Sequence, residues 1–299
     1  MPARVLARGM AVDTTAEIHE HEAEGWQRGL YDDVKVTFRA PVVNWIFRTL
    51  LANEPAATRY LWGQVKPLFE TEACLSAVDE HRGAVRVRTD PDRLAAADLD
   101  LAPGEFRELQ GQLATFDAVV PRLSVLFEVA DRGLQGDLEP SGDPAPAATR
   151  PHGRPGVPAD RRPPTMATVA DSESALPETV SAVRSLHGLE EGLPSVYRCL
   201  AQWPDAFRAI WGAAAPELRS EGFRTATEQT ADVAERAVTG AAYAPRLAPA
   251  DFAAVGLEDE AIAGLRDLFA EFNRGAVETV LPAVHVLAAA VGAGSGSAT

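Results

Sequence analysis

Apolar residues in this chain recur mostly three or four positions apart, which is typical of helices that bury one face. The clearest case is residues 105–130, where the apolar positions are Phe106, Leu109, Leu113, Phe116, Val120, Leu123 and Leu126. They predict one long helix, which Pro121 should kink. A similar stripe predicts a closing helix over residues 258–291. Only residues 31–38 and 84–89 also fit a strand, so the predicted fold class is all-α.

One stretch of the chain occurs twice. Residues 55–72 read PAATRYLWGQVKPLFETE and residues 204–221 read PDAFRAIWGAAAPELRSE, with seven of eighteen positions identical at an offset of 149. The identities include Trp62 with Trp211, in a chain that has only five tryptophans. Just upstream, IFRTL at 46–50 corresponds to VYRCL at 196–200. This period is too long for a solenoid. It predicts a tandem duplication that forms a pseudo-two-fold pair of helical units.

The segment between the two units has a different composition. Residues 140–176 are rich in Pro, Ala, Gly, Asp and Arg and contain almost no large apolar side chain. Such a segment cannot offset the entropy lost on ordering, so we predict a disordered linker. The predicted organisation is a first helical repeat at 13–139, the linker at 140–176, a second repeat at 177–292 and a flexible tail at 293–299.

The chain is strongly acidic. Its net charge is −15, with 43 acidic against 28 basic residues, and its only lysines are Lys35 and Lys66. An acidic, lysine-poor and alanine-rich composition resembles that of halophilic proteins, whose repulsion is screened by molar salt. An ordinary acidic cytoplasmic protein is the equal alternative. In both cases the charge argues against nucleic acids and anionic membranes as partners.

Nothing in the sequence predicts a metal or an export signal. Cys74 and Cys199, the only cysteines, lie in no ligand spacing, and they read as buried apolar residues in a reducing compartment. The N-terminus has no sustained apolar run of the signal-peptide kind. The longest apolar run, residues 280–291, is too short to span a bilayer. We therefore expect a cytoplasmic protein without cofactors, and a homodimer is left open.

The usual local signatures of catalysis are absent, including phosphate loops, nucleophile elbows and zinc-binding helices. An active site would have to be assembled between the two units, where a duplicated fold forms its natural cleft.

The segments VVNWIFRTL (42–50) and YRCLAQWPD (197–205) resemble the group I 2-haloacid dehalogenases, the all-helical class. The resemblance extends over residues 25–130 and 178–291. It implies two fused helical repeats with the active site between them. It also implies hydrolysis of 2-halocarboxylic acids without metal or organic cofactor, by an activated water that displaces halide directly. The implied ligand is a small organic or halogenated carboxylic acid.

The resemblance also implies the residues of the pocket. The first repeat supplies Asn44, Phe47 and Leu50, and the second supplies Ser195, Val196 and Tyr197. Arg48 and Arg198 are a matched pair beside this cleft. Each is a candidate to bind a carboxylate, and the alternative role is a structural ion pair.

At one position the sequence departs from the family pattern. The resemblance places the catalytic aspartate directly after the equivalent of Ser195, but this chain has Val196, which cannot accept a proton. Asp205 is the fallback base, and Glu191 is a more distant one. Three hypotheses follow: a dehalogenase with a displaced base, a catalytically silent relative that binds an organic acid, and a structural protein that keeps only the fold. A carboxylate near a polar cavity favours the first, an inward arginine without a carboxylate the second, and a filled apolar seam the third.

Overall fold

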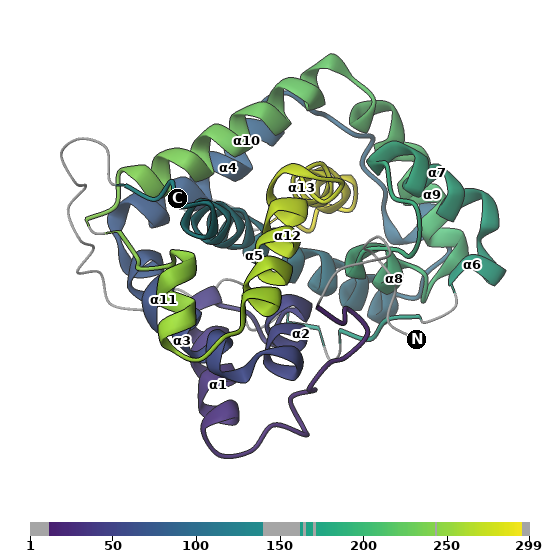
Figure 1. Cartoon of the computed structure of the whole chain (residues 1–299). Helices are drawn as coiled ribbons and strands as arrows, with labels where there is room; N and C mark the ends of the chain where they lie inside the picture. The colour runs from purple at the N-terminus through teal and green to yellow at the C-terminus, as the bar shows by residue number, and fades with distance from the viewer. Residues whose placement is uncertain (1–11, 140–161, 164–165, 170–171, 243, 295–299) are drawn as a thin grey trace.

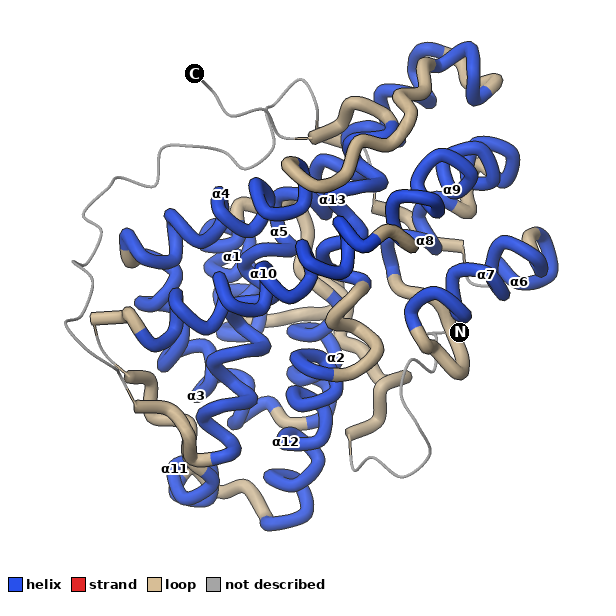
Figure 2. The backbone as a smooth tube through the Cα atoms, turned by 90° about the horizontal axis from the view of Figure 1, so that it is seen from above, coloured by secondary structure: helices blue, strands red, loops and turns tan. Residues whose placement is uncertain are grey.

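The computed structural model describes residues 12–139, 162–163, 166–169, 172–242 and 244–294. Over these residues the regular structure is helical and no strand is present (Figure 2). The predicted all-α class is thus confirmed. In chain order the elements are α1 Trp26–Phe38, α2 Trp45–Asn53, α3 Pro55–Val65, the 3-10 helix η1 Lys66–Glu70, α4 Glu72–Arg86, the 3-10 helix η2 Ala96–Leu99, α5 Pro103–Gln135, α6 Ser172–Ala175, α7 Pro177–His187, α8 Ser195–Leu200, α9 Pro204–Leu218, α10 Glu221–Thr239, α11 Pro249–Ala254, α12 Asp259–Arg274 and α13 Val280–Ala290.

The long helix α5 runs through the middle of the molecule (Figure 1). Helices α10, α12 and α13 from the second half of the chain pack against it, and α4 lies along α10 at one edge. Helix α13, VLPAVHVLAAA, is buried on almost every side, as expected for a helix without a polar face. The two halves therefore share one core.

The proline inside α5 is accommodated by a side chain from another helix. Pro121 has no backbone N–H, so the carbonyl of Asp117 loses its usual helical donor. The Arg82 guanidinium on α4 donates to that carbonyl instead, at 3.3 Å. The predicted long helix thus continues past its proline, over the 33 residues of α5.

Two helices of the first half resemble helices of the second in how they begin. Helices α3 and α9 both begin with a proline, as the repeated sequence predicts. Helices α4 and α10 both begin after a hydroxyl residue, Thr71 and Ser220, whose side chain accepts a backbone N–H of the first turn.

The aromatic cores of the two halves also correspond. Phe47 meets Trp62 edge to face at 5.4 Å between ring centroids, and Tyr197 meets Trp211 in the same manner at 6.0 Å. The matched tryptophans are buried core residues in both halves. These likenesses agree with a tandem duplication, and superposition of residues 25–130 on 178–291 remains its test.

Neither segment that also fitted a strand is one. Residues 31–38 lie in α1, whereas residues 84–86 end α4 and residues 87–89 follow it outside regular structure. One local prediction is corrected. The closing helix over 258–291 is two helices, α12 and α13. The extended backbone of Gly275 ends the first one.

The predicted linker, residues 140–176, lies mostly outside the described residues. Its described end is packed on the second half: the Val169 N–H donates to the Arg198 carbonyl at 3.0 Å, Ser172–Ala175 forms α6, and Leu176 is buried. In the predicted tail 293–299, Ala293 is also buried, while residues 295–299 lie outside the described part.

Candidate functional site

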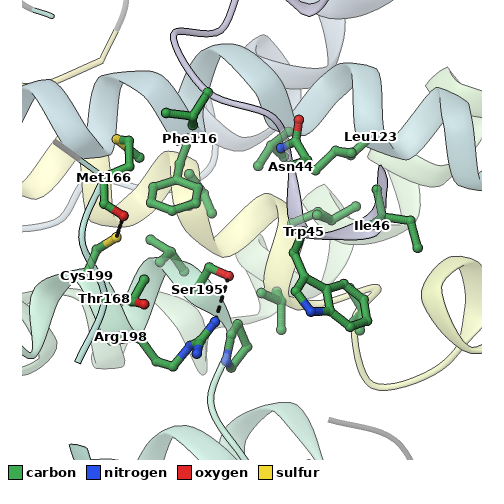
Figure 3. Close-up of a pocket in the computed structure, with 18 of the residues that line it drawn as sticks. Asn44, Trp45, Ile46, Phe116, Leu123, Met166, Thr168, Ser195, Arg198 and Cys199 are labelled. Carbon is green, nitrogen blue, oxygen red and sulfur yellow. Dashed lines mark hydrogen bonds between the residues drawn. The ribbon is translucent and has the colours of Figure 1, made fainter. Parts of the chain in front are cut away.

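A cavity of about 180 Å³ lies between the two halves, where α2 and α8 begin beside α5, α12 and α13 (Figure 3). Most of its wall is apolar, and its polar side chains are those of Asn44, Arg48, Thr168, Ser195 and Arg198. The complete lining is Val42, Val43, Asn44, Trp45, Ile46, Arg48, Phe116, Val120, Leu123, Phe127, Met166, Thr168, Leu193, Pro194, Ser195, Val196, Arg198, Cys199, Phe272, Val277, Val280, Leu281 and Val284.

Corresponding turns bring the two helix starts to this cavity. The residue before α2, Asn44, has φ −63° and ψ 150°, and the residue before α8, Pro194, has φ −56° and ψ 150°. This extended backbone changes the chain direction just before each helix, so the residues around it line the cavity. Neither helix start is capped by a side chain.

The first arginine of the cavity is held by the protein itself. The Arg48 Nε lies 2.7 Å from a carboxylate oxygen of Glu17, and its Nη1 donates to the Val43 carbonyl at 2.7 Å. The Glu17 side chain is only 9 % exposed. Arg48 therefore forms a structural ion pair, one of the two roles expected for it.

The second arginine has no such partner. The Arg198 Nη2 approaches the Ser195 hydroxyl at 3.4 Å, and its buried Nε has no hydrogen bond. Burial lowers the pKa of Arg198, while the charge of Glu17 acts in the opposite direction. Within the described part of the chain, no carboxylate forms an ion pair with Arg198. Its guanidinium is thus available to an anion that enters the cavity.

The structure brings five predicted residues together and separates three from them. Asn44, Arg48, Ser195, Val196 and Arg198 all line the cavity. Three others do not line it: Phe47, Leu50 and Tyr197 are buried in the cores of their own halves. A helix turns by about 100° per residue, so only part of each helix faces the cavity, and these three side chains lie on the part that faces the core.

Tyr197 shows where such a side chain goes. Its hydroxyl lies 2.6 Å from His187 Nε2, and its ring stacks near Phe207. Burial raises the pKa of Tyr197 well above its ordinary value. Tyr197 therefore belongs to the core of the second half and not to the cavity.

No carboxylate is present in the wall of the cavity over the residues that the structure describes. Val196, at the position where the resemblance implies the base, is buried in that wall, and Val120 lines it too. The fallback Asp205 points to solvent with 89 % of its side chain exposed, and it forms an ion pair with Arg208. Glu191 is also exposed. Neither fallback residue is placed to activate a water molecule inside the cavity.

Several lining residues were not predicted. Phe116 and Phe272 face the cavity, and they are identical residues at an offset of 156, so the repeat itself could have indicated them. Trp45 stacks on Phe272 at 5.6 Å between ring centroids. Met166 and Thr168 lie in the predicted linker, where composition gave no reason to expect a site.

The described residues contain no group of three His, Cys, Asp or Glu side chains placed to hold a metal ion. Within the same residues, no helix is both long and apolar enough to cross a membrane.

Comparison with known structures identifies the fold. The fold matches that of a D-2-haloacid dehalogenase mutant with a TM-score of 0.72 and 18 % identity, covering 94 % of each chain. It also matches a mutant in complex with D-2-CPA (TM-score 0.73, 18 % identity) and an enzyme in complex with L-LA (TM-score 0.73, 19 % identity); both matches cover 94 % of this chain and 97 % of the other. The chain has the all-helical D-2-haloacid dehalogenase fold.

The family comparison agrees. The model of the family described as halocarboxylic acid dehydrogenase DehI matches residues 41–177. The predicted resemblance to the group I 2-haloacid dehalogenases is confirmed. No curated protein sequence matches the chain.

Proposed function

We propose that this protein binds a small organic carboxylate in the cavity between its halves and does not hydrolyse 2-haloacids. The single observation that carries the proposal is the composition of the cavity wall. The wall includes Arg198, which has no carboxylate partner. None of the described residues that line the cavity is an Asp or a Glu. Such a site can hold an anion but has no group to deprotonate water.

The chemistry of halide displacement explains why the missing carboxylate matters. Water attacks the carbon opposite the halogen and must lose a proton as it does so, and a positioned base typically contributes about 10² to 10⁴-fold to the rate. Val196 supplies no such base. The carboxylate of Glu17, which bonds the lining residue Arg48, is already engaged by that guanidinium.

The cavity offers groups that suit a carboxylate ligand. Two of the solved structures are described as complexes with D-2-CPA and L-LA, which are small carboxylic acids. Arg198 and Ser195 offer donors for a carboxylate here, and the aromatic walls around Phe116 and Phe272 suit an apolar body. The open cavity disfavours the purely structural alternative, in which an apolar seam would be filled.

Halide release tests the proposal directly. The unmodified protein, incubated with D- and L-2-chloropropionate in dilute and in molar salt, should release no chloride above the uncatalysed rate. Val196→Asp should raise chloride release. Val196→Asn should not, because asparagine has nearly the shape of aspartate but cannot act as a base. Rapid turnover by the unmodified protein that survives Val196→Ala would refute the proposal, and Asp205 would then be the next residue to change.

A further inference from the structure

The two arginines of the cavity occupy equivalent positions, as the repeat of IFRTL and VYRCL shows. The surrounding backbone is equivalent as well. The Ile18 N–H donates to the Arg48 carbonyl at 3.2 Å, and the Val169 N–H donates to the Arg198 carbonyl at 3.0 Å. In each half, a segment that precedes the helices therefore runs past the arginine and pairs with it.

This pairing sets the register of the two segments. The residue before Ile18 is Glu17, and the residue before Val169 is Thr168. Glu17 and Thr168 are thus equivalent residues in the two halves. Glu17 bonds the Nε of Arg48 at 2.7 Å, whereas Thr168 carries no charge and lines the cavity. The atom of Arg198 that lacks a partner is this same Nε.

The charges at this end of the cavity do not cancel. Arg48 and Arg198 contribute two positive charges and Glu17 one negative charge, which leaves a net charge of +1. One monovalent anion neutralises this end, whereas a dianion would reverse its sign.

We propose that the carboxylate of the ligand binds Arg198 beside Thr168, in the place that the Glu17 carboxylate occupies on Arg48, and that the ligand is a monocarboxylate with an apolar body about the size of a benzene ring. The inference rests on the proposed function and assigns its ligand class. The Glu17–Arg48 pair is the internal example of the contact that the ligand makes.

The cavity sets the size of the apolar body. A cavity of about 150 Å³ lined by aliphatic and aromatic side chains binds benzene, and the volume here is about 180 Å³. Trp45, Phe116, Phe127 and Phe272 supply aromatic surface to its wall. A two- or three-carbon acid would leave most of this volume empty, so its apolar contacts would be few.

The experiment measures binding to the full chain by calorimetry, and by the change in tryptophan fluorescence, to which Trp45 in the cavity wall contributes. Phenylacetate should bind at least about tenfold more tightly than propionate, because it fills the apolar volume. Phenylacetamide, which has the same shape without the charge, should bind at least about tenfold more weakly than phenylacetate.

Two substitutions locate the carboxylate. Thr168→Glu places in the second half the carboxylate that Glu17 supplies in the first, so it should pair with Arg198 and reduce phenylacetate affinity at least about 30-fold. Thr168→Gln is the matched uncharged control and should keep at least about ten times the affinity of Thr168→Glu. Both variants should unfold at temperatures no lower than the unmodified protein. A loss of affinity then reflects competition between the new carboxylate and phenylacetate for Arg198, and not misfolding.

Each failure has a distinct meaning. If Thr168→Glu binds phenylacetate as the unmodified protein does, the carboxylate does not lie at Arg198 beside Thr168. If propionate or 2-chloropropionate binds as tightly as phenylacetate, the ligand class is wrong while acid binding stands. If neither phenylacetate nor any short acid binds, the proposed function itself fails.

Discussion

Two regions of this molecule hold buried charge in opposite ways. Asp117, with a fully buried side chain at the centre of α5, accepts from His285 at 2.7 Å, from Arg82 at 3.1 Å and from Arg86 at 3.2 Å. Arg198, in α8, has one long contact to Ser195 and a buried Nε without a partner.

The hydrogen bonds around Asp117 extend further. His285 lies 3.0 Å from His81, and His81 lies 2.9 Å from the Ser124 hydroxyl. With both imidazoles neutral, all donors can point toward Asp117: Ser124 to His81, His81 to His285, and His285 to the carboxylate. Every member is satisfied, and helices α4, α5 and α13 are joined.

The difference separates a structural site from a binding site. A buried polar network in which every group is paired fixes one packing of its helices. An unpaired buried group costs free energy that a ligand can recover, and natural proteins contain few of them. On this argument the network of Asp117, His285, His81 and Ser124 serves the fold, whereas Arg198, whose buried Nε has no partner, is where we propose that the ligand binds.

The largest effect should come from removing the buried aspartate. Asp117→Asn removes the buried carboxylate that Arg82 and Arg86 share and should lower the free energy of unfolding by about 3 to 5 kcal/mol. Arg198→Gln removes an unpaired charge and should change it by less than about 1 kcal/mol. Urea unfolding of both variants measures the contrast.

The control for this pair is Asp205→Asn, at an exposed ion pair that should contribute less than about 1 kcal/mol. Equal losses for Asp117→Asn and Arg198→Gln would break the comparison, because both charges would then be structural.

The next effect concerns acid. Burial lowers the pKa of His187 to about 4, and it also lowers the pKa values of His285 and His81. The unfolded chain binds protons at these histidines below about pH 6.5, whereas the folded chain does not. The free energy of unfolding should therefore fall as the pH drops below that value, by up to about 1.4 kcal/mol per pH unit for each histidine.

Asp117 extends the fall in the free energy of unfolding to lower pH. Burial alone would raise its pKa, but His285, Arg82 and Arg86 outweigh burial and hold the pKa of Asp117 well below its usual range. The ionised Asp117 therefore stabilises the folded protein above about pH 4, and this stabilisation is lost as the pH falls below that value. Urea unfolding across this range measures the slope. His187→Gln should make the slope shallower between about pH 6.5 and about pH 4, and a stability independent of pH there would contradict neutral buried histidines.

The sequence predicts the all-α fold and several lining residues of the cavity, because both depend on local patterns. Helical periodicity indicated α5, and the matched motifs indicated Arg48 and Arg198. The network around Asp117 could not be predicted in this way. Asp117 and His285 are 168 positions apart, and no spacing rule relates residues on helices that meet only in the folded chain.

The differences between the predicted and the observed lining have equally local causes. Tyr197 and Val196 belong to one motif, but their side chains leave α8 in directions about 100° apart, and the side chain of Tyr197 enters the core of the second half. Thr168 was assigned to a linker because its segment lacks large apolar residues. A backbone hydrogen bond to the Arg198 carbonyl, which composition does not reveal, holds its neighbour Val169 in place.

The smallest effect should come from salt, which acts on the surface and not on buried pairs. Net charge is −15, so exposed acidic groups repel one another in dilute buffer, and molar KCl screens them over about 3 Å. Melting temperature should rise by a few degrees from dilute buffer to molar KCl, the equivalent of about 1 to 2 kcal/mol. Asp117→Asn should show the same rise from a lower starting point, because its lost contacts are shielded from solvent ions. A curve that is flat or falls with salt would reject the halophilic interpretation and leave ordinary acidity. A rise confined to the unmodified protein would instead mean that salt reaches the network around Asp117, and that this buried charge responds to salt as the surface charges do.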